Sequence, residues 1–352
     1  MFQREEIYIL CDRNQLTFLP ENIKSLYSLA WLNLSYNSLP ALPSGLVLLS
    51  SLTTLLLNNL YLTELPDDLG LLSQLETLEV RDNYLTSLPP SLHQLERLAR
   101  LDLGNNQLDR LEVALTNCPA LTELWLDNNQ IAVVPPAVKH LARLSLLDLS
   151  GNCVELVAGE LGQLQSLTHL NLTGNKLQSV PGEMFQSDSF SVLQLSHNRL
   201  KGLPPSLALC HRLEELSLDH NGLVSLPPDI GELRSLHYLD LSNNCLESLP
   251  TELASLQQLS VLSVRNNIIA SLPPHIGLCS SLAVLDLRGN LIQHLPPTFS
   301  SLPSLRYHWL PLPEMQEEEE EVSHFLYSLQ VSLVDGEPVS PAAGLPSGDG
   351  GR

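Results

Sequence analysis

Apolar residues, most of them leucines, recur along the chain with a constant period. Aligned on the asparagine of each LxLxxN string, leucine or phenylalanine occupies one register position every 23 residues, from Leu29 to Leu305. Extended one step back to Glu6, the register comprises thirteen units over residues 6–304 and a partial unit after them. This period predicts stacked repeats rather than the two or three globular domains that 352 residues would otherwise suggest.

Each unit reads LxxLxLxxNxLxxLPxxLxxLxx, and its parts predict local conformations. The LxxLxL part alternates as a short strand does, with leucines pointing inward and the residues between them on a concave face. Later leucines such as Leu92 and Leu95 lie three apart and suit a short helical or 3₁₀ turn on the convex side. One unit cannot bury its own leucines, so neighbours must stack. The predicted fold is an α/β leucine-rich-repeat solenoid with a curved parallel sheet.

The asparagine and the proline of the unit have separate structural reasons. Twelve of the thirteen units carry the asparagine, with Leu60 as the exception. A buried amide must be satisfied, so these side chains are expected to form a hydrogen-bonded ladder along the stack. The proline ends the extended stretch without needing a backbone donor. Eleven units have it, and Glu112 and Ala158 replace it in the other two.

The repeat pattern divides the chain into three predicted parts. Residues 1–310 form the array, residues 311–335 an acidic run and a short capping helix, and residues 336–352 a disordered tail rich in Gly, Pro and Ser. The helix is inferred from an apolar face at Val322, Phe325, Leu326 and Leu329. The array begins abruptly, which indicates either a minimal cap or, as we favour, a shortened product of a longer gene.

Charge and cysteine usage narrow the range of partners and compartments. The net charge of −21 disfavours nucleic acid and anionic lipid headgroups and favours basic protein surfaces. No signal peptide and no run of 18 apolar residues is visible, so direct membrane insertion is not expected. The six cysteines are scattered without a CxxC pair, which indicates reduced thiols and a cytoplasmic protein.

Side chains on the concave face do not pack in the core and are therefore the first candidates for binding. One predicted protein-binding site is an acidic stretch around an exposed tryptophan, comprising Glu79, Asp102, Glu123, Trp125, Asp127 and Asp148. A secondary patch of mixed charge comprises Tyr238, Asp240, Arg265, Asp286 and Arg288. For each residue alone, an ordinary solvated repeat surface is the preferred explanation of its polarity. For the group around Trp125 as a whole, a large aromatic on a solvated strand favours binding.

The sequence carries no motif for catalysis or for a cofactor. It lacks a glycine-rich phosphate loop, an HExxH string and a nucleophile elbow. His197 and His220 occupy the same position in successive repeats, but no carboxylate or cysteine in an equivalent position completes a metal site. Two solvated histidines are the preferred interpretation. Three cysteines share a repeat position that other units fill with leucine, and they are predicted to act as small hydrophobic residues in the core: Cys118, Cys210 and Cys279.

Several strings are more specific than the repeat itself. The succession resembles the repeat domain of the LAP family of cell-polarity scaffolds, which includes Scribble, Erbin and Lano, over roughly residues 29–310. The resemblance is carried by Leu55 to Asn58 with its missing asparagine, Leu75 to Asn83, Leu101 to Asn106, Leu121 to Asp127 and Val284 to Leu310. It implies cytoplasmic scaffolding at the lateral plasma membrane through protein partners. Related Ras-pathway repeat scaffolds share the same unit.

These observations predict a monomeric, non-enzymatic scaffold or adaptor that binds other proteins on its concave face. A preformed surface of this kind loses little entropy on binding. One alternative is a regulatory subunit that targets a phosphatase or a GTPase. Another is the binding fragment of a larger multidomain enzyme.

Overall fold

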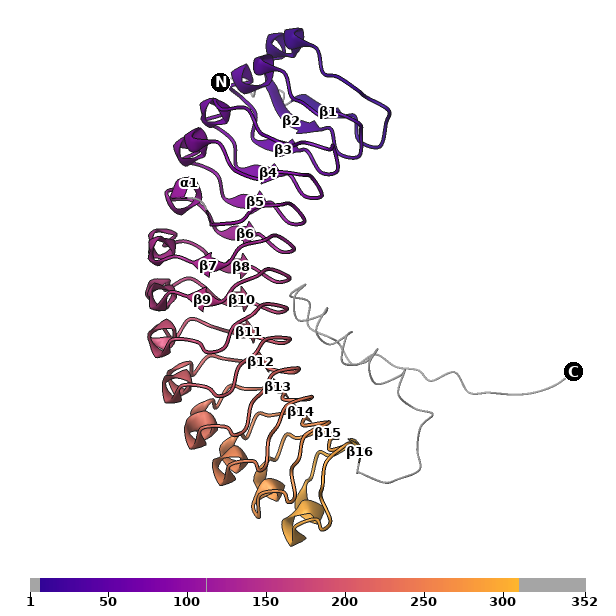
Figure 1. Ribbon diagram of the computed structural model, residues 1–352, viewed down its shortest axis with the longest axis vertical. Coiled ribbons are helices and arrows are strands. Elements are labelled where there is room, and N and C mark those ends of the chain that lie inside the picture. Colours follow the sequence, from indigo (N-terminus) through magenta and orange to yellow (C-terminus); the bar gives the residue numbers. More distant parts are fainter. Residues whose placement is uncertain (1–6, 112, 310–352) are drawn as a thin grey trace, which may run out of the picture. The chain divides into compact units, whose positions relative to one another are not determined.

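The computed structural model describes residues 7–111 and 113–309, which form a curved stack of repeats (Figure 1). The strands of the main sheet run in chain order along the inner side of the curve, and β7 and β9 lie between this sheet and the outer helical segments. Their bounds are β1 (Ile7–Leu10), β2 (Leu29–Asn33), β3 (Thr54–Leu56), β4 (Thr77–Glu79), β5 (Arg100–Asp102), β6 (Glu123–Trp125), β7 (Val133–Val134), β8 (Leu146–Asp148), β9 (Leu156–Val157), β10 (His169–Asn171), β11 (Val192–Gln194), β12 (Glu215–Ser217), β13 (Tyr238–Asp240), β14 (Val261–Ser263), β15 (Val284–Asp286) and β16 (Tyr307–Trp309).

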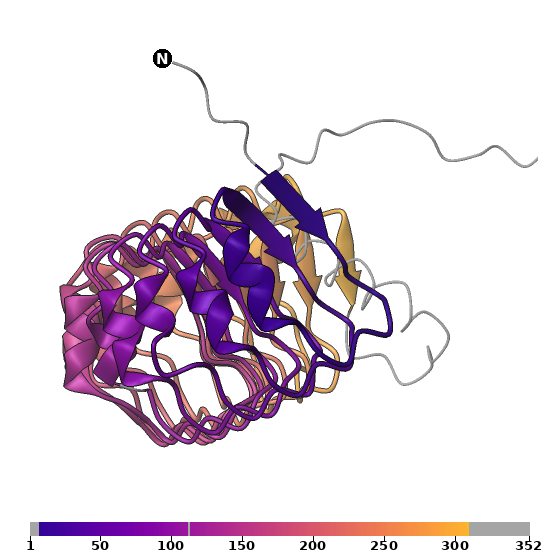
Figure 2. The ribbon, with the colours of Figure 1, turned by 90° about the horizontal axis from the view of Figure 1, so that it is seen from above.

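Short helical segments occupy the outer side of the curve and confirm the predicted 3₁₀ turns. Viewed from above, the turns superpose with the helical segments on one side and the strands on the other (Figure 2). The 3₁₀ segments are η1 (Glu21–Ser25), η2 (Ser44–Leu48), η3 (Leu69–Leu71), η4 (Pro90–Gln94), η5 (Pro136–His140), η6 (Gly159–Gln163), η7 (Gly182–Phe185), η8 (Pro205–Leu209), η9 (Pro228–Glu232), η10 (Thr251–Ser255), η11 (Ile276–Leu278) and η12 (Pro297–Ser301). A short α-helix, α1 (Val113–Thr116), takes this place in one repeat.

The main sheet of the described chain is parallel and contains 14 strands, each paired with its counterpart in the next repeat. Leu78 lies opposite Leu101, and Leu124 opposite Leu147, so the register advances by one whole repeat at each step. Strands β7 and β9 form a separate two-stranded parallel sheet. Strands stack about 4.8 Å apart, which is closer than helical segments can pack, so the stack bends toward the strand side.

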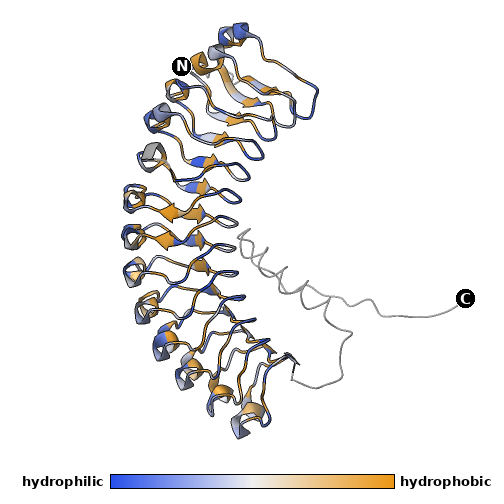
Figure 3. Ribbon diagram, viewed as in Figure 1, coloured by the Kyte–Doolittle hydropathy of each residue, from blue (hydrophilic) through white to orange (hydrophobic). Residues whose placement is uncertain are grey.

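A continuous core of leucines fills the space between the strands and the helical segments. Hydrophobic and hydrophilic stretches alternate within each turn of the array (Figure 3). The leucines of strand β6 and its flanks, Leu121, Leu124 and Leu126, are completely buried. The predicted inward-facing positions are therefore confirmed. The cysteines Cys118 and Cys210 share this core, and burial raises the pKa of the Cys210 thiol to about 12, as expected for inert packing residues.

The predicted asparagine ladder is present. Asn129 donates from Nδ2 to the carbonyl oxygens of Leu103 (3.0 Å) and Leu126 (3.1 Å), and its Oδ1 accepts from the Leu108 amide (2.9 Å). Each asparagine thereby joins its own turn to the preceding repeat. Leu60, which stands where the asparagine is missing, is fully buried and packs in the core instead.

A proline in the extended conformation directly precedes most of the 3₁₀ segments, although Asp68 precedes η3 and His275 precedes η11. Pro89, for example, has φ −64° and ψ 138° immediately before η4. Ala158, which replaces the proline in one repeat, adopts φ −73° and ψ 138° before η6. Neighbouring repeats therefore impose this conformation without the pyrrolidine ring. The predicted capping helix and tail of residues 311–352 lie outside the described residues.

Candidate protein-binding face

Four of the residues predicted to bind partners form one row across the concave face. In the strand register, Glu79 lies opposite Asp102, Asp102 opposite Trp125, and Trp125 opposite Asp148, on the adjacent strands β4, β5, β6 and β8. Side chains in one row of a parallel sheet point to the same side and lie about 4.8 Å apart. The structure therefore brings together residues that are as many as 69 positions apart in the sequence.

Arg100, two residues before Asp102 on strand β5, lies in the neighbouring row and adds a positive charge beside these carboxylates. Its guanidinium contacts Glu79 at 3.5 Å and Glu123 at 3.3 Å. It also covers the ring of Trp125, with 4.3 Å between Cζ and the ring centroid, which is a cation–π contact. Trp125 is consequently half-buried rather than exposed, and the acidic stretch around it also includes the basic side chain of Arg100.

Arg81 forms a second ion-pair centre on the same face. Its Nη1 contacts Asp102 at 3.2 Å, and both of its terminal nitrogens reach the carboxylate of Asp127, with Nη1 2.8 Å from Oδ1. Asp127 is only 6% exposed. A two-pronged contact to a buried carboxylate fixes the guanidinium in position and raises the pKa of Arg81, mainly through Asp127.

Gly104 makes the contact between Arg81 and Asp127 possible. These two residues are 46 positions apart, and Gly104 occupies the same position in the repeat that separates them. A Cβ at Gly104 would collide with both the Arg81 guanidinium and the Asp127 carboxylate. The ion pair therefore passes over a glycine, which leaves room where other repeats have a side chain.

The carboxylates of this face are held in a partly desolvated environment. Burial raises the pKa of Asp102, and the Gly104 amide and the Arg81 charge act against that effect. Burial likewise raises the pKa of Asp148, whose Oδ1 accepts hydrogen bonds from the Ser150 amide (2.8 Å) and hydroxyl (2.6 Å). We call the whole set the Trp125 cluster, comprising Glu79, Arg81, Arg100, Asp102, Glu123, Trp125, Asp127 and Asp148.

Sequence reasoning missed the role of Arg81, Arg100 and Gly104 in this cluster. The signal was available, because all three stand in outward-facing columns beside the acidic residues. Comparing neighbouring repeats would have paired Arg100 with Glu123 in the same column and with Glu79 in the adjacent column.

The secondary patch is less accessible than predicted. Tyr238 is 4% exposed and Asp286 is 3% exposed, so neither is the surface anchor that the sequence suggested. Tyr238 directs its hydroxyl to Asp240 at 3.4 Å, and Arg288 pairs with Asp286 at 2.7 Å. The outward-facing positions of these strands are crowded by their neighbours on the concave face. Arg265 and Arg288 remain half-buried at the edge of this group.

Burial also changes the acidity of this region. It raises the pKa of Asp240 to about 6, and the neighbouring Asp219 carboxylate contributes in the same direction. The Glu215 carboxyl has a raised pKa for the same principal reason. Tyr238 lies between these acids, which together with burial raise its pKa.

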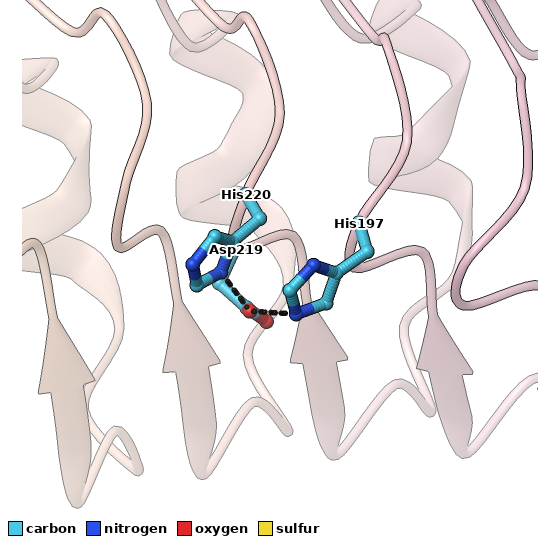
Figure 4. A group of neighbouring side chains, drawn as sticks. All are labelled: His197, Asp219 and His220. Carbon is cyan, nitrogen blue, oxygen red and sulfur yellow. Dashed lines mark hydrogen bonds and ion pairs between the residues drawn. The ribbon is translucent and has the colours of Figure 1, made fainter.

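The histidine pair predicted to be simply solvated has a third member. The rings of His197 and His220 stack with their centroids 4.1 Å apart, as their equivalent repeat positions predict. Asp219 lies between them, with its Oδ2 2.8 Å from His220 Nδ1 and 3.7 Å from His197 Nε2 (Figure 4). The search for a carboxylate at an equivalent repeat position did not find Asp219, because it stands one position earlier, directly before His220.

The family model for leucine-rich repeats matches residues 73–131, 119–177, 165–223, 211–269 and 257–307. The chain belongs to the leucine-rich repeat family. This fold is typically a protein-interaction module without enzymatic activity, and its members bind other proteins or peptides. A search of curated protein sequences found no match.

Solved structures agree with this assignment. A leucine-rich repeat protein of Leptospira interrogans is 31% identical, covers 84% of this chain and 82% of its own, and superposes with a TM-score of 0.69. An internalin from Listeria monocytogenes shares the fold at 22% identity, with 88% of each chain covered and a TM-score of 0.75. Within residues 7–111 and 113–309, no helical segment has the length and apolarity that a bilayer-spanning helix requires.

A plant receptor gives an example of a ligand-bound relative. The ectodomain of the receptor kinase GASSHO1/SCHENGEN3 from Arabidopsis thaliana was solved in complex with CASPARIAN STRIP INTEGRITY FACTOR 2. It is 29% identical, with a TM-score of 0.52. The match covers 83% of the present chain but only 42% of that receptor chain.

Proposed function

We propose that this protein is a non-enzymatic scaffold or adaptor that binds a protein partner on the concave face at the Trp125 cluster. The observation that carries the proposal is the contact of Arg100 with three side chains at once, Glu79, Glu123 and the ring of Trp125. Tryptophan and arginine are the residues most often found at the energetic centres of protein interfaces.

The physical advantage of the cluster is that its side chains are already ordered. Arg81 and Arg100 are each held by two carboxylates, so a partner need not immobilise them on binding. The loss of side-chain entropy that normally opposes association is thereby reduced. The surrounding strands are joined by the asparagine ladder, which keeps the rows of side chains in register.

The chemistry of the partner follows from the charge of the protein. The net charge of −21 attracts a basic partner over long distances, and the carboxylates around Trp125 offer acceptors to lysine or arginine side chains. Arg100 would remain above the indole and limit how deeply an aromatic residue could insert. A basic peptide or protein surface therefore fits this face better than an acidic or purely apolar one.

The resemblance to the LAP scaffolds supports a more specific role within this proposal. It suggests work in cell polarity or in Ras-type signalling, in the cytoplasm or at the lateral plasma membrane. The plant receptor solved in complex with CASPARIAN STRIP INTEGRITY FACTOR 2 supports the general mode, in which a leucine-rich repeat chain holds a partner. The monomer predicted from the sequence is part of the same proposal.

The proposal is tested with a variant that removes the partly exposed side chains of strand β6, Trp125→Ala/Glu123→Ala. We expect at least a tenfold loss of specifically bound protein in quantitative affinity capture, because truncating an interface centre costs 2 kcal/mol or more, about 30-fold in affinity. Leu209→Ala is the matched control, since it removes an exposed apolar side chain from the outer segment η8. Thermal unfolding must show that both variants remain folded.

Two outcomes would redirect the interpretation. An identical set and amount of captured proteins from wild type and the β6 variant would disprove binding at the Trp125 cluster. The wild type but not the variant could capture a phosphatase or GTPase, and the purified enzyme could bind the wild type directly. That result would identify the regulatory-subunit form of the proposal.

A further inference from the structure

Three potential metal ligands converge at the ends of strands β11 and β12, away from the Trp125 cluster. The donor atoms of His197, Asp219 and His220 all lie within 4.8 Å of one another (Figure 4). Both histidine rings approach the same carboxylate oxygen, Asp219 Oδ2. This is the one group of three or more histidine, cysteine or acidic side chains with such a geometry in the described part of the chain.

The backbone places the two histidines at an unusual position in the repeat. His197 has φ 53° and His220 has φ 52°, which is the left-handed region. Most other repeats fill this position with asparagine or glycine, which adopt that conformation at little cost. Histidine in two successive repeats therefore accepts some backbone strain, and the consequence is a pair of imidazoles in register.

We propose that His197, Asp219 and His220 bind one divalent transition-metal ion of the zinc class. Two imidazole nitrogens and one carboxylate oxygen are a ligand set that Zn²⁺ uses in proteins, whereas Ca²⁺ and Mg²⁺ require oxygen ligands. Zinc bonds of about 2.0–2.2 Å place ligand atoms roughly 3.4 Å apart, so small side-chain rotations bring the three donors to bonding distance.

The surroundings of the three ligands allow those rotations and still hold the site in place. The side chains of His197 and His220 are 55% and 47% exposed, so they are free to turn. Their backbones are fixed, because the His197 amide donates to the Asp219 carbonyl (2.8 Å) and the His220 amide to the Ser242 carbonyl (2.9 Å). Side-chain adjustment therefore needs no movement of the repeats.

Ser196 orients the carboxylate of the site. Its hydroxyl donates to Asp219 Oδ1, which leaves Oδ2 directed at the histidines. Hydrogen-bonded partners of this kind hold metal ligands in orientation and strengthen binding. The ion would take the place of the hydrogen bond between Asp219 Oδ2 and His220 Nδ1, and its fourth coordination position would be open to water or to a donor from a partner. The site lies several repeats from Trp125 and does not depend on binding there.

Titration of the full-length protein with zinc chloride by isothermal calorimetry tests the proposal. We expect binding of one zinc ion per chain to the wild type, at a site that His197→Asn and His220→Asn each weaken at least tenfold. Asparagine is the matched replacement, because Asn105, Asn128, Asn243 and Asn266 occupy this position elsewhere with positive φ. His211→Ala, at an exposed histidine outside the group, is expected to leave the affinity unchanged.

A further variant separates metal binding from general attraction of cations to an acidic protein. Ser196→Ala retains all three ligands and is expected to weaken zinc binding roughly tenfold through loss of carboxylate orientation. Equal affinity in the wild type and both histidine variants would overturn the proposal, as would the absence of any binding by folded wild-type protein. Unchanged circular dichroism spectra would show that the variants keep the fold.

Discussion

At the residue scale, Gly104 shows how one absent side chain permits a contact between two distant repeats. Arg81 reaches Asp127 only because the position between them has no Cβ. The glycine does not need a left-handed conformation here, and its role is therefore one of space. Burial of Asp127 makes this contact costly to break, because a buried carboxylate would lose its charged partner.

We expect Gly104→Ala to lower the free energy of unfolding by about 1–3 kcal/mol, since the new methyl group displaces the Arg81 guanidinium. Chemical denaturation followed by circular dichroism measures this change. Gly202→Ala is the control, because no heavy atom lies within 4 Å of the added Cβ. A Gly104 variant as stable as the Gly202 variant would contradict the role of the glycine.

Asp240 provides a pH-dependent effect at the same scale. Folding raises its pKa from 3.8 to about 6, so the folded protein holds the proton more tightly than the unfolded chain. The stabilisation by the protonated carboxyl is complete below about pH 4 and is lost as the pH rises through about 6. Above that pH, the buried, ionised carboxylate of Asp240 lowers the free energy of unfolding.

Asp240→Asn removes this cost. We expect the variant to exceed the wild type in unfolding free energy by up to about 3 kcal/mol at pH 7.5, and the difference to shrink as the pH falls toward 4. Urea denaturation at a series of pH values provides the measurement. The exposed Asp229→Asn is the matched control and should show no such trend. A constant difference across the series would exclude titration of Asp240 as the cause.

At the scale of elements, the asparagine ladder joins each repeat to its predecessor. Asn129 serves four backbone groups in two repeats, all of them buried. The segments between the strands tolerate more variation in sequence, because α1 replaces a 3₁₀ segment in one repeat and Ala158 keeps the extended conformation of the proline that it replaces in another. Contacts between repeats therefore matter more than the local propensity of each segment.

We expect Asn129→Ala to lower the free energy of unfolding by roughly 3 kcal/mol, because four backbone groups lose their partner in a buried position. Gln130→Ala changes the adjacent, exposed side chain and should have little effect. Thermal and chemical denaturation compare the two. If Asn129→Ala were no more harmful than Gln130→Ala, the ladder would not be a principal source of stability.

At the scale of the whole molecule, the curvature converts a linear sequence pattern into one broad surface. Residues 23 positions apart become neighbours in a row, as Asp102 and Trp125 do. Binding groups can then be assembled from several repeats, none of which contains a complete site. The Trp125 cluster draws on strands β4, β5, β6 and β8, and the metal site that we propose draws on two repeats.

The sequence by itself determined the repeat length, the strand register, the outer 3₁₀ turns and the rows of outward-facing residues. These features depend on a periodic placement of apolar side chains, and every repeat unit contains the same pattern. The positions of Glu79, Asp102, Trp125 and Asp148 in one row follow directly from it. The buried asparagines and cysteines follow for the same reason.

Only the tertiary structure decided which polar side chains contact one another and how far each is exposed to solvent. Arg100 covers Trp125, Arg81 crosses Gly104 to Asp127, and neighbouring side chains bury Tyr238. These outcomes depend on side-chain direction and on the bulk of residues one or two repeats away. A periodic pattern specifies which face a residue occupies, but long polar side chains cross between rows. The reach of those side chains, which no local pattern encodes, determined the charge and accessibility of the candidate site.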